Sequence, residues 1–213
     1  DVMSRTVASD KPSEKQFLRR HLQERRALLS PEERTQAGER IVENVCASAW
    51  WKRASAIHVY CSVGTEVPTN GLLHVALREG KRVIVPITPQ KGTMLLHAEI
   101  FLTTRFEVGK YGIPVPTAET SSKCEPTQIL TGNDCVFVPL LGYDVFAHRI
   151  GYGAGYYDRF LEQFGTERGV RPLFIGLAFG VQYIEEGIKA ENHDIPLDGI
   201  MTEQLLQKKQ PFP

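Results

Sequence analysis

The sequence predicts an α/β domain in which a mostly parallel sheet lies between helices. Short apolar runs typical of buried strands alternate with helical patterns over the middle and end of the chain. The chain has 213 residues, 42% of them hydrophobic, which suffices for one compact core. Such sheets bind ligands at the carboxyl ends of their strands. We therefore expect the loops after Cys61, Pro139 and Ala178 to meet at one site.

The first part of the chain predicts two helices. Ser30-Pro31-Glu32-Glu33 is a capping box with proline at the first helical position, so a second helix begins there. Before it, residues 13 to 29 are strong helix formers. This first helix carries a group of cations, namely Lys15, Arg19, Arg20, Arg25 and Arg26.

Strand and helix patterns then alternate. Residues rich in β-branched and aromatic side chains predict strands at 55–61, 82–86, 134–139 and 172–178, with a further one at 94–101. Helices are expected at 69–79 and 156–164, each closed by a glycine, and a helix-like pattern covers 182–189. The segment 105–132 is rich in Pro, Gly, Ser and Thr, and predicts a surface excursion long enough to serve as a lid.

Composition sets the domain limits and the class of protein. We expect residues 1–12 to be a disordered extension or a remnant of cloning, 13–205 a single domain, and 206–213 a tail. Lys plus Arg and Asp plus Glu both total 25, so net charge favours neither a nucleic-acid nor a membrane partner. Four widely spaced cysteines and the absence of a long apolar run predict a soluble, cytoplasmic protein. A mitochondrial or other organellar form, with its transit peptide removed, stays open.

The glycine-rich stretch beginning at Arg149 is the strongest candidate for a site. Gly151, Gly153 and Gly155 alternate before a helical pattern, so their N–H groups can converge on an anion. It matches neither the Walker pattern nor the dinucleotide pattern, whose glycines directly follow a strand. A plain flexible turn is the alternative. Asp158 is a dipole partner of the helix, or a magnesium ligand if a nucleotide binds nearby.

Arg149-Ile-Gly-Tyr-Gly-Ala-Gly-Tyr-Tyr-Asp158 resembles the signature of the 5-formyltetrahydrofolate cyclo-ligase (5,10-methenyltetrahydrofolate synthetase) family. Further matches follow in order over nearly the whole chain after residue 14. They are Lys15-x-x-Leu-Arg19, Glu66, Tyr111-Gly-Ile-Pro114, Val138-Pro139, Tyr143-Asp144, Gly176-Leu-Ala-Phe179 with Gln182, and His193-Asp194 through Thr202-Glu203. Ala154, Leu140 and Pro68 depart from the family's pattern, and Ala154 stands where many relatives have lysine or glycine.

The resemblance implies a three-layer Rossmann-like domain, as in certain sugar-phosphate isomerases and CoA transferases. It also implies a ligase that uses ATP and Mg2+ to convert 5-formyltetrahydrofolate to 5,10-methenyltetrahydrofolate, releasing ADP and phosphate. We expect the protein to be a monomer. Carried over by position, the catalytic residues would be Arg149, Lys15 and Tyr152. ATP would contact Lys15, Arg19, Arg149, Gly151, Tyr152, Gly153, Ala154, Gly155, Tyr156 and Tyr157. Folate would contact Arg19, Cys61, Glu66, Tyr152 and Tyr156, and Mg2+ would bind Asp158 and Asp194.

The chemistry of that reaction suits these residue types. The formyl group on N5 is an amide whose oxygen leaves poorly, so phosphorylation by ATP must come before ring closure. Cations, backbone N–H groups and magnesium serve that step, and no covalent nucleophile is needed. Cys61 is therefore expected to be a pocket wall. The six histidines show no metal-ligand spacing.

Two other functions stay open at this point. One is an enzyme of the same fold class that works without ATP, such as a CoA transferase or a phosphosugar isomerase. The other is a non-catalytic protein whose basic first helix binds RNA or an acidic partner.

Overall fold

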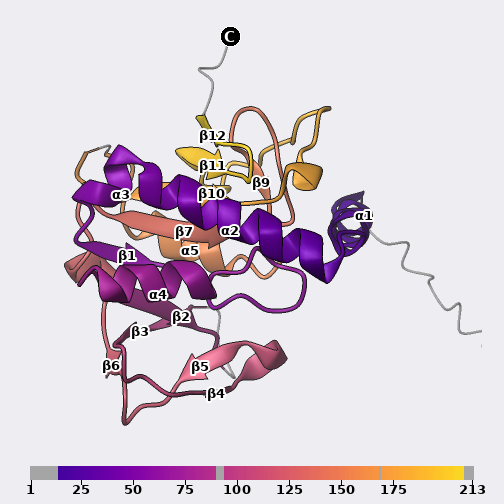
Figure 1. Cartoon of the computed structure of the whole chain (residues 1–213). Coiled ribbons are helices and arrows are strands. Elements are labelled where there is room, and N and C mark those ends of the chain that lie inside the picture. The colour runs from indigo at the N-terminus through magenta and orange to yellow at the C-terminus, as the bar shows by residue number, and fades with distance from the viewer. Residues whose placement is uncertain (1–13, 90–93, 168, 209–213) are drawn as a thin grey trace, which may run out of the picture.

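A mixed sheet of eight strands forms the centre of the molecule in a computed structural model, which describes residues 14–89, 94–167 and 169–208 (Figure 1). The strand order is β12-β11-β10-β7-β1-β2-β3-β6. From β11 to β2 the neighbouring strands are parallel, and the outer pairs are antiparallel. The strands are β1 (Ala56–His58), β2 (Arg82–Ile87), β3 (Leu96–Ile100), β6 (Ser122–Lys123), β7 (Cys135–Pro139), β10 (Leu173–Leu177), β11 (Gly199–Met201) and β12 (Leu206–Lys208).

Helices cover both faces of this sheet, which gives three layers. On one face α2 (Pro31–Ala47), α3 (Ala49–Arg53) and α4 (Asn70–Arg78) pack against Phe137 and its neighbours. On the other face α5 (Tyr156–Glu162) packs through Phe160 against Val136 and Val138. Because side chains of a strand alternate between faces, β7 contributes to both cores. The predicted α/β architecture with a mostly parallel sheet is confirmed.

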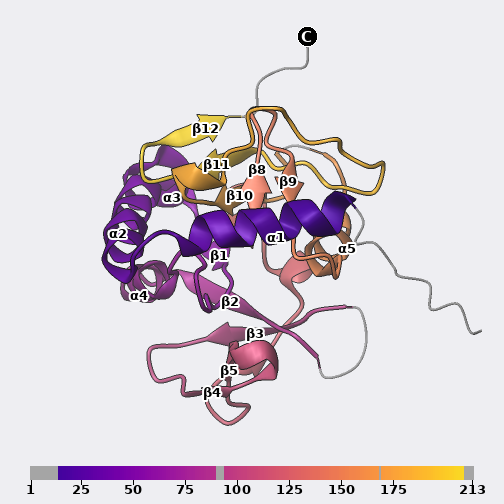
Figure 2. The same cartoon turned by 90° about the vertical axis from the view of Figure 1, so that its right-hand side faces the viewer.

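Helix α1 (Glu14–Ala27) lies apart from these layers, at the end of the sheet toward which β7 points (Figures 1 and 2). Its Leu22 is 1% exposed and packs with Leu141, Ile150 and Ile184. The helix thus closes the carboxyl ends of the parallel strands, where the sequence places the ligand site.

The predicted helix ends are confirmed. Glu33 N donates to Ser30 Oγ (3.1 Å) and Ser30 N donates to Glu33 Oε2 (2.7 Å), which completes the capping box. Gly80 and Gly165 follow α4 and α5 with φ of +73° and +69°, a left-handed conformation that favours glycine.

One predicted element is wrong. Residues 182–189 do not form a helix; a 3-10 turn, η3 (Gly180–Gln182), ends where the helix was expected to begin. Gln182 is buried, and its side-chain amide donates to the carbonyl oxygens of Leu140 (2.8 Å) and Leu141 (3.1 Å). Gly187 then adopts φ of +80°, which an α-helix does not allow.

The glycine-rich stretch does follow a strand, contrary to expectation. A two-stranded ribbon of β8 (Gly142–Tyr143) and β9 (Arg149–Ile150) stands outside the main sheet, and β9 ends directly before Gly151. The segment 105–132 contains a second ribbon of β4 (Phe106–Val108) and β5 (Pro114–Pro116), joined by η1 (Lys110–Gly112). It then adds β6 to the sheet and a short turn, η2 (Pro126–Gln128). A lid function for this segment stays a prediction.

The ends of the chain complete the description. The expected extension 1–12 lies outside the described residues. β12 pairs with β11, so the sheet includes residues 206–208 of the segment that the sequence predicts as a tail. Among the described helices, none has the length and apolar character required to cross a bilayer.

Candidate functional site

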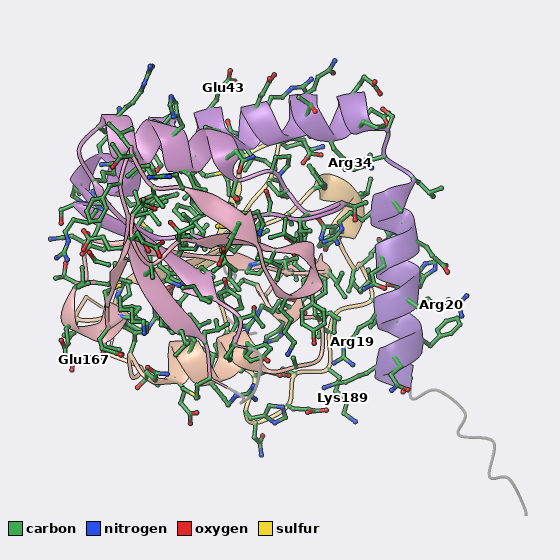
Figure 3. All side chains as sticks on the ribbon, turned by 90° about the horizontal axis from the view of Figure 1, so that it is seen from below. Arg19, Arg20, Arg34, Glu43, Glu167 and Lys189 are labelled. Carbon is green, nitrogen blue, oxygen red and sulfur yellow. The ribbon has the colours of Figure 1, made fainter. Side chains whose placement is uncertain are left out.

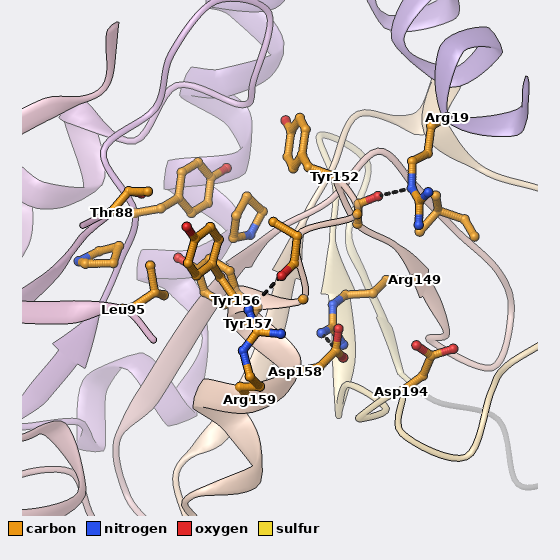
Figure 4. A pocket seen from close by; sticks show the side chains of 18 of the residues that line it. Arg19, Thr88, Leu95, Arg149, Tyr152, Tyr156, Tyr157, Asp158, Arg159 and Asp194 are labelled. Carbon is orange, nitrogen blue, oxygen red and sulfur yellow. Dashed lines mark hydrogen bonds and ion pairs between the residues drawn. The ribbon is translucent and has the colours of Figure 1, made fainter. Parts of the chain in front are cut away.

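A pocket of about 930 Å³ opens at the carboxyl ends of the parallel strands (Figure 4). The loop after β1 and the residue Pro139 line it, as predicted. The loop after β10 contributes only its distant part, residues 189–194. Further walls come from α1, the end of β2, the β4–β5 ribbon and the stretch 149–159. The pocket therefore collects residues from both ends of the chain.

The pocket has a charged side and an apolar side. Figure 4 shows Thr88 and Leu95 on one side, Arg149, Asp158 and Asp194 on the other, and the rings of Tyr156 and Tyr157 between them. Lys15, Arg19 and Lys189 add cations, and Tyr60, Cys61, Pro86 and Ile113 add apolar surface. Such a pocket suits a ligand that is charged at one end and flat and largely apolar at the other.

Arg149 ties the glycine loop to the segment that carries Asp194. Its guanidinium forms an ion pair with Asp158 at 2.5 Å and also donates to the carbonyl oxygen of Ile195. Ile195 N in turn donates to Asp158 Oδ1 (3.2 Å). The two predicted magnesium ligands thus lie on adjoining segments, and one of them is held by the predicted phosphate ligand.

Arg19 lies over the glycines. Its Nε donates to the carbonyl oxygen of Gly151 (3.0 Å), as Figure 4 shows. Gly153 has φ of +101°, and a Cβ at this position would lie 3.2 Å from Arg19 Cζ. The dihedral angle therefore favours glycine at 153, and a larger residue would also press on the end of the Arg19 side chain. At Gly151 the backbone is ordinary, and an added Cβ would meet no described atom within 4 Å.

Tyr152 and Glu66 form a hydrogen-bonded pair in the wall. Tyr152 Oη donates to Glu66 Oε1 (2.7 Å), and Val63 N donates to Glu66 Oε2 (2.8 Å). Burial raises the pKa of the Glu66 carboxyl, while the bonds from Tyr152 and Val63 and the charge of Arg26 oppose that rise. Glu66 accordingly offers acceptor oxygens beside an apolar surface.

The hydroxyl of Tyr157 is buried and has no hydrogen-bond partner among the described residues. Tyr157 lines the pocket, whereas most buried hydroxyls in proteins are paired. Tyr156 also lines it, with Arg159 packed 5.5 Å from its ring centroid. The wall of the pocket therefore contains a buried hydroxyl that makes no hydrogen bond to the described residues.

Cys61 behaves as a pocket wall. It is 5% exposed, and burial, reinforced by Glu66, raises the pKa of its thiol to about 12. A thiol with such a pKa remains protonated near neutral pH and is a poor nucleophile.

The described residues offer two carboxylates, but not a complete set of ligands, for a metal ion. Asp158 bonds to Arg149 and Ile195, and Asp194 accepts from Glu191 N (2.7 Å). Within the described ranges, no group of three or more His, Cys, Asp or Glu residues is arranged to hold a metal. Magnesium commonly takes one or two carboxylates and completes its shell with phosphate oxygens and water. Two carboxylates beside a cation-lined pocket fit that pattern.

The cations of α1 do not form one surface. Lys15 and Arg19 line the pocket, and Lys15 also forms an ion pair with Glu191. Arg26 is buried. Figure 3 shows Arg19 directed at the body of the molecule and Arg20 directed away from it. This division argues against a helix that presents all its charges to RNA or an acidic partner.

Arg26 is the main residue that sequence reasoning misplaced. The sequence predicts it as one of the cations that a basic helix presents to a partner, yet it is 5% exposed and contacts Tyr152. The spacing of Lys15, Arg19, Leu22 and Arg26 carried the signal, because these positions share one face of a helix. The sequence also missed Tyr60, Arg159 and Lys189 as lining residues.

Comparisons with known proteins agree with one another. The model of the 5-formyltetrahydrofolate cyclo-ligase family matches residues 11–203. A mouse protein named 5-formyltetrahydrofolate cyclo-ligase is 27% identical over 195 residues, which cover 90% of this chain and 94% of that protein. The Escherichia coli protein of the same name is 25% identical, covering 85% and 96%. The solved structure of Aquifex aeolicus 5,10-methenyltetrahydrofolate synthetase superposes with a TM-score of 0.76 at 28% identity, covering 93% and 94%.

Proposed function

Because this chain belongs to the 5-formyltetrahydrofolate cyclo-ligase family, we propose that it converts 5-formyltetrahydrofolate to 5,10-methenyltetrahydrofolate at the expense of ATP. One observation carries the proposal for this site. A single pocket of about 930 Å³ joins a cation-lined side, suited to phosphates, to an apolar side with tyrosines and a carboxylate, suited to a pterin.

The reaction needs the two ligands side by side. The formyl oxygen attacks the γ-phosphorus of ATP, and ADP leaves. N10 then adds to the activated formyl carbon and loses its proton, and inorganic phosphate departs with the former formyl oxygen to leave the methenyl bridge. The protein has to align two reactants and neutralise charge on the transferred phosphoryl group, because the bond changes occur between the ligands themselves.

The phosphate side is assigned to Lys15, Arg19 and Arg149 with the backbone N–H groups of the glycine loop. Arg19 is already anchored on Gly151 and Arg149 on Asp158, so both guanidinium groups are ordered before ATP arrives. Preordered cations stabilise transferred charge with little reorganisation. Ala154 cannot add a cation, so the positive charge must come from these side chains and from the other cations that line the pocket, Arg159 and Lys189.

The folate side is assigned to Cys61, Glu66, Tyr152 and Tyr156. Cys61 and the tyrosine rings provide surface for a flat heterocycle. The Glu66 carboxylate accepts hydrogen bonds, as the N–H-rich edge of a pterin requires. Tyr152 stands on the glycine loop and bonds to Glu66, so it joins the two sides.

Magnesium would be held by Asp158 and Asp194 together with phosphate oxygens. The ion would neutralise phosphate charge there. The residues fit this role by the chemistry of their oxygens and by their position on adjoining segments tied together by Arg149.

The test is a direct assay with a matched pair of variants. Purified protein with 5-formyltetrahydrofolate, ATP and Mg2+ should produce the near-ultraviolet methenyl chromophore and ADP in equal amounts. Arg19→Ala should raise KM for ATP about tenfold, the effect of losing one charge-assisted hydrogen bond. Arg20→Ala is the control, because Arg20 is the exposed neighbour and pairs with Glu24 of the same helix at 3.2 Å.

The outcomes separate the alternatives. Turnover of a CoA ester or a sugar phosphate without any nucleotide would favour the ATP-independent enzyme. Salt-sensitive RNA binding that Arg20→Ala weakens would favour the binding protein. Absence of the methenyl product, where a cyclo-ligase relative forms it, would overturn the proposal.

We further propose that the protein acts as a monomer without a nucleic-acid partner. One chain supplies both sides of the pocket, and its positive and negative charges balance at 25 each. Light scattering at assay concentration should give a particle of one chain. The cytoplasmic location stays a prediction.

A further inference from the structure

Arg26 lies behind the pocket wall, in the last turn of α1. Its side chain is 5% exposed, and it is not among the residues that line the pocket. Its guanidinium contacts three loops at the carboxyl ends of the strands. Nε donates to Thr65 Oγ1 (3.0 Å), and Nη1 donates to the carbonyl oxygen of Leu140 (3.3 Å) and to Tyr152 Oη (2.9 Å).

This burial is unusual for a cation. Within residues 14–89, 94–167 and 169–208, no ion pair joins Arg26 to a carboxylate. A buried charge is costly unless other groups compensate it. The compensating acid is Glu66, which Arg26 reaches through the hydroxyl of Tyr152.

The donors and acceptors available fix the direction of the hydrogen bonds from Arg26 through Tyr152 to Glu66. Arginine has only donors, so Tyr152 Oη must accept from Arg26. The single hydrogen of that hydroxyl is then directed to Glu66 Oε1, 2.7 Å away. Val63 N occupies Oε2 from the other side. Glu66 is thereby held as an acceptor, with its remaining lone pairs available to a ligand.

We propose that Arg26 is a positioning residue, which acts through Tyr152 to hold Glu66 as a fixed hydrogen-bond acceptor for the pterin. The proposal rests on the assignment of Glu66 and Tyr152 to the folate side. It adds a residue that touches neither ligand, and it gives α1 a role on the folate side besides its contacts with phosphate.

The surroundings of Glu66 make the role measurable. The titratable groups that face it are Arg26 from α1, Tyr60 and Cys61 from the loop after β1, Tyr152 from the glycine loop and Tyr157 from α5. Burial raises the pKa of Glu66, and Arg26 and Tyr152 counteract that rise. Removal of either one should therefore raise the pKa further, so that the carboxylate is lost at a higher pH.

The first measurement needs no activity. In a 13C NMR titration of the ligand-free protein, the Glu66 carboxyl, assigned by its loss in Glu66→Gln, should titrate at higher pH in Arg26→Gln than in the parent. Arg25→Gln is the matched control, because Arg25 holds the same helix turn through the carbonyl oxygen of Tyr183 (3.4 Å). An unchanged Glu66 titration in Arg26→Gln, or an equal shift in Arg25→Gln, would overturn the proposal.

A double-mutant cycle tests whether Arg26 acts through Tyr152. Each of Arg26→Gln and Tyr152→Phe should raise KM for 5-formyltetrahydrofolate about tenfold, more at pH 6 than at pH 8, with a smaller effect on KM for ATP. The combined variant should lose little more than either single variant. If the effects of the two substitutions on KM were fully additive, Arg26 would act only by holding the loops together through Thr65 and Leu140. Arg26→Lys, which retains the charge, should restore most of the Glu66 titration.

Tyr152→Phe keeps the proposal testable if the Arg26→Gln protein does not fold. The Tyr152 side chain is at the surface, 44% exposed, and its replacement leaves the bonds of Arg26 to Thr65 and Leu140 in place. If Arg26→Gln does not fold, a Tyr152→Phe protein whose Glu66 titrates as in the parent overturns the proposal. Should the NMR shifts appear in a protein without turnover, the network stands and the proposed reaction fails.

Discussion

Arg149 forms an ion pair with Asp158 at 2.5 Å, and the two side chains are 5% and 26% exposed (Figure 4). One of these residues is assigned to phosphate and the other to magnesium. These two charges therefore compensate each other before a ligand binds. Binding of ATP with magnesium would then bring phosphate to the ordered guanidinium of Arg149 and the metal to the carboxylate of Asp158.

Replacement of Asp158 by asparagine should alter the magnesium dependence. The variant keeps an oxygen for Ile195 N but loses the charge that attracts the metal. The Mg2+ concentration for half-maximal rate should rise about tenfold or more, the effect of losing one charged ligand interaction. The comparison is Glu162→Gln, another carboxylate that lines the pocket on the same helix, whose magnesium curve should match that of the parent. Equal curves for Asp158→Asn and the parent would exclude Asp158 as a ligand.

Gly153→Ala and Gly151→Ala should differ in stability. Gly153 has φ of +101° and would place a Cβ 3.2 Å from Arg19 Cζ, so alanine there should lower the free energy of unfolding by about 1–2 kcal/mol. Gly151 has neither constraint, and alanine there should change stability by less than about 0.5 kcal/mol. Urea unfolding measures both. Equal losses at the two positions would show that the loop does not keep this conformation.

Tyr157→Phe should separate stability from binding. Its hydroxyl is buried without a partner, so removal should leave the free energy of unfolding unchanged or raise it by up to about 1 kcal/mol. Tyr60→Phe is the opposite case, because Tyr60 Oη donates to the carbonyl oxygen of Val67 (3.2 Å) and its loss should cost about 1 kcal/mol. If a ligand uses the Tyr157 hydroxyl, KM for that ligand should rise several-fold in Tyr157→Phe. A clear loss of stability in Tyr157→Phe would show that the Tyr157 hydroxyl does make a hydrogen bond in the folded protein.

The histidine pair under α5 should make the fold sensitive to acid. His58 Nε2 lies 3.2 Å from His97 Nδ1, and both rings pack 4.5 Å from Phe160. Burial lowers the pKa of His97 from 6.5 to about 4 and lowers that of His58 as well. The unfolded chain therefore takes up protons that the folded protein excludes as the pH falls from about 6.5 to about 4. The free energy of unfolding should fall over this range by about 3 kcal/mol for His97 alone, at 1.36 kcal/mol per unit of pKa shift.

The measurement is urea unfolding at several pH values, in the parent and in a variant with both His58 and His97 replaced by leucine. The double replacement removes both titrating rings and leaves no buried imidazole nitrogen without a partner. Its stability should depend less on pH between 6.5 and 4. The same slope in both proteins would mean that the histidines are not excluded from protonation.

The sequence predicted the central strands well because they are apolar runs long enough to recognise. β2, β7 and β10 have five or six residues each, and each follows a clear pattern. β8, β9 and β11 have two or three residues and were missed. In such short strands the partner strand, not the local sequence, determines the conformation.

The site was predicted less completely, for a different reason. The sequence indicated the charges at Arg149 and Asp158, but their ion pair depends on how the loop folds back, and Ile195 joins it from 37 residues away. Arg26 was taken for a surface cation because its charge was considered without Leu22 on the same helix face. Where a polar side chain finds its partner is decided by tertiary packing, which propensity does not encode.

The position of α1 has a consequence for the order in which the protein is assembled. Arg19 bonds across 132 residues to Gly151, and Arg26 across 126 residues to Tyr152. During synthesis this helix leaves the ribosome well before its partners, which emerge only when most of the sheet has been made. Contacts so distant in sequence carry a large loop-closure cost. We therefore expect a nascent chain to form its sheet before α1 docks. The pocket would then be able to bind its ligands only at the end of folding.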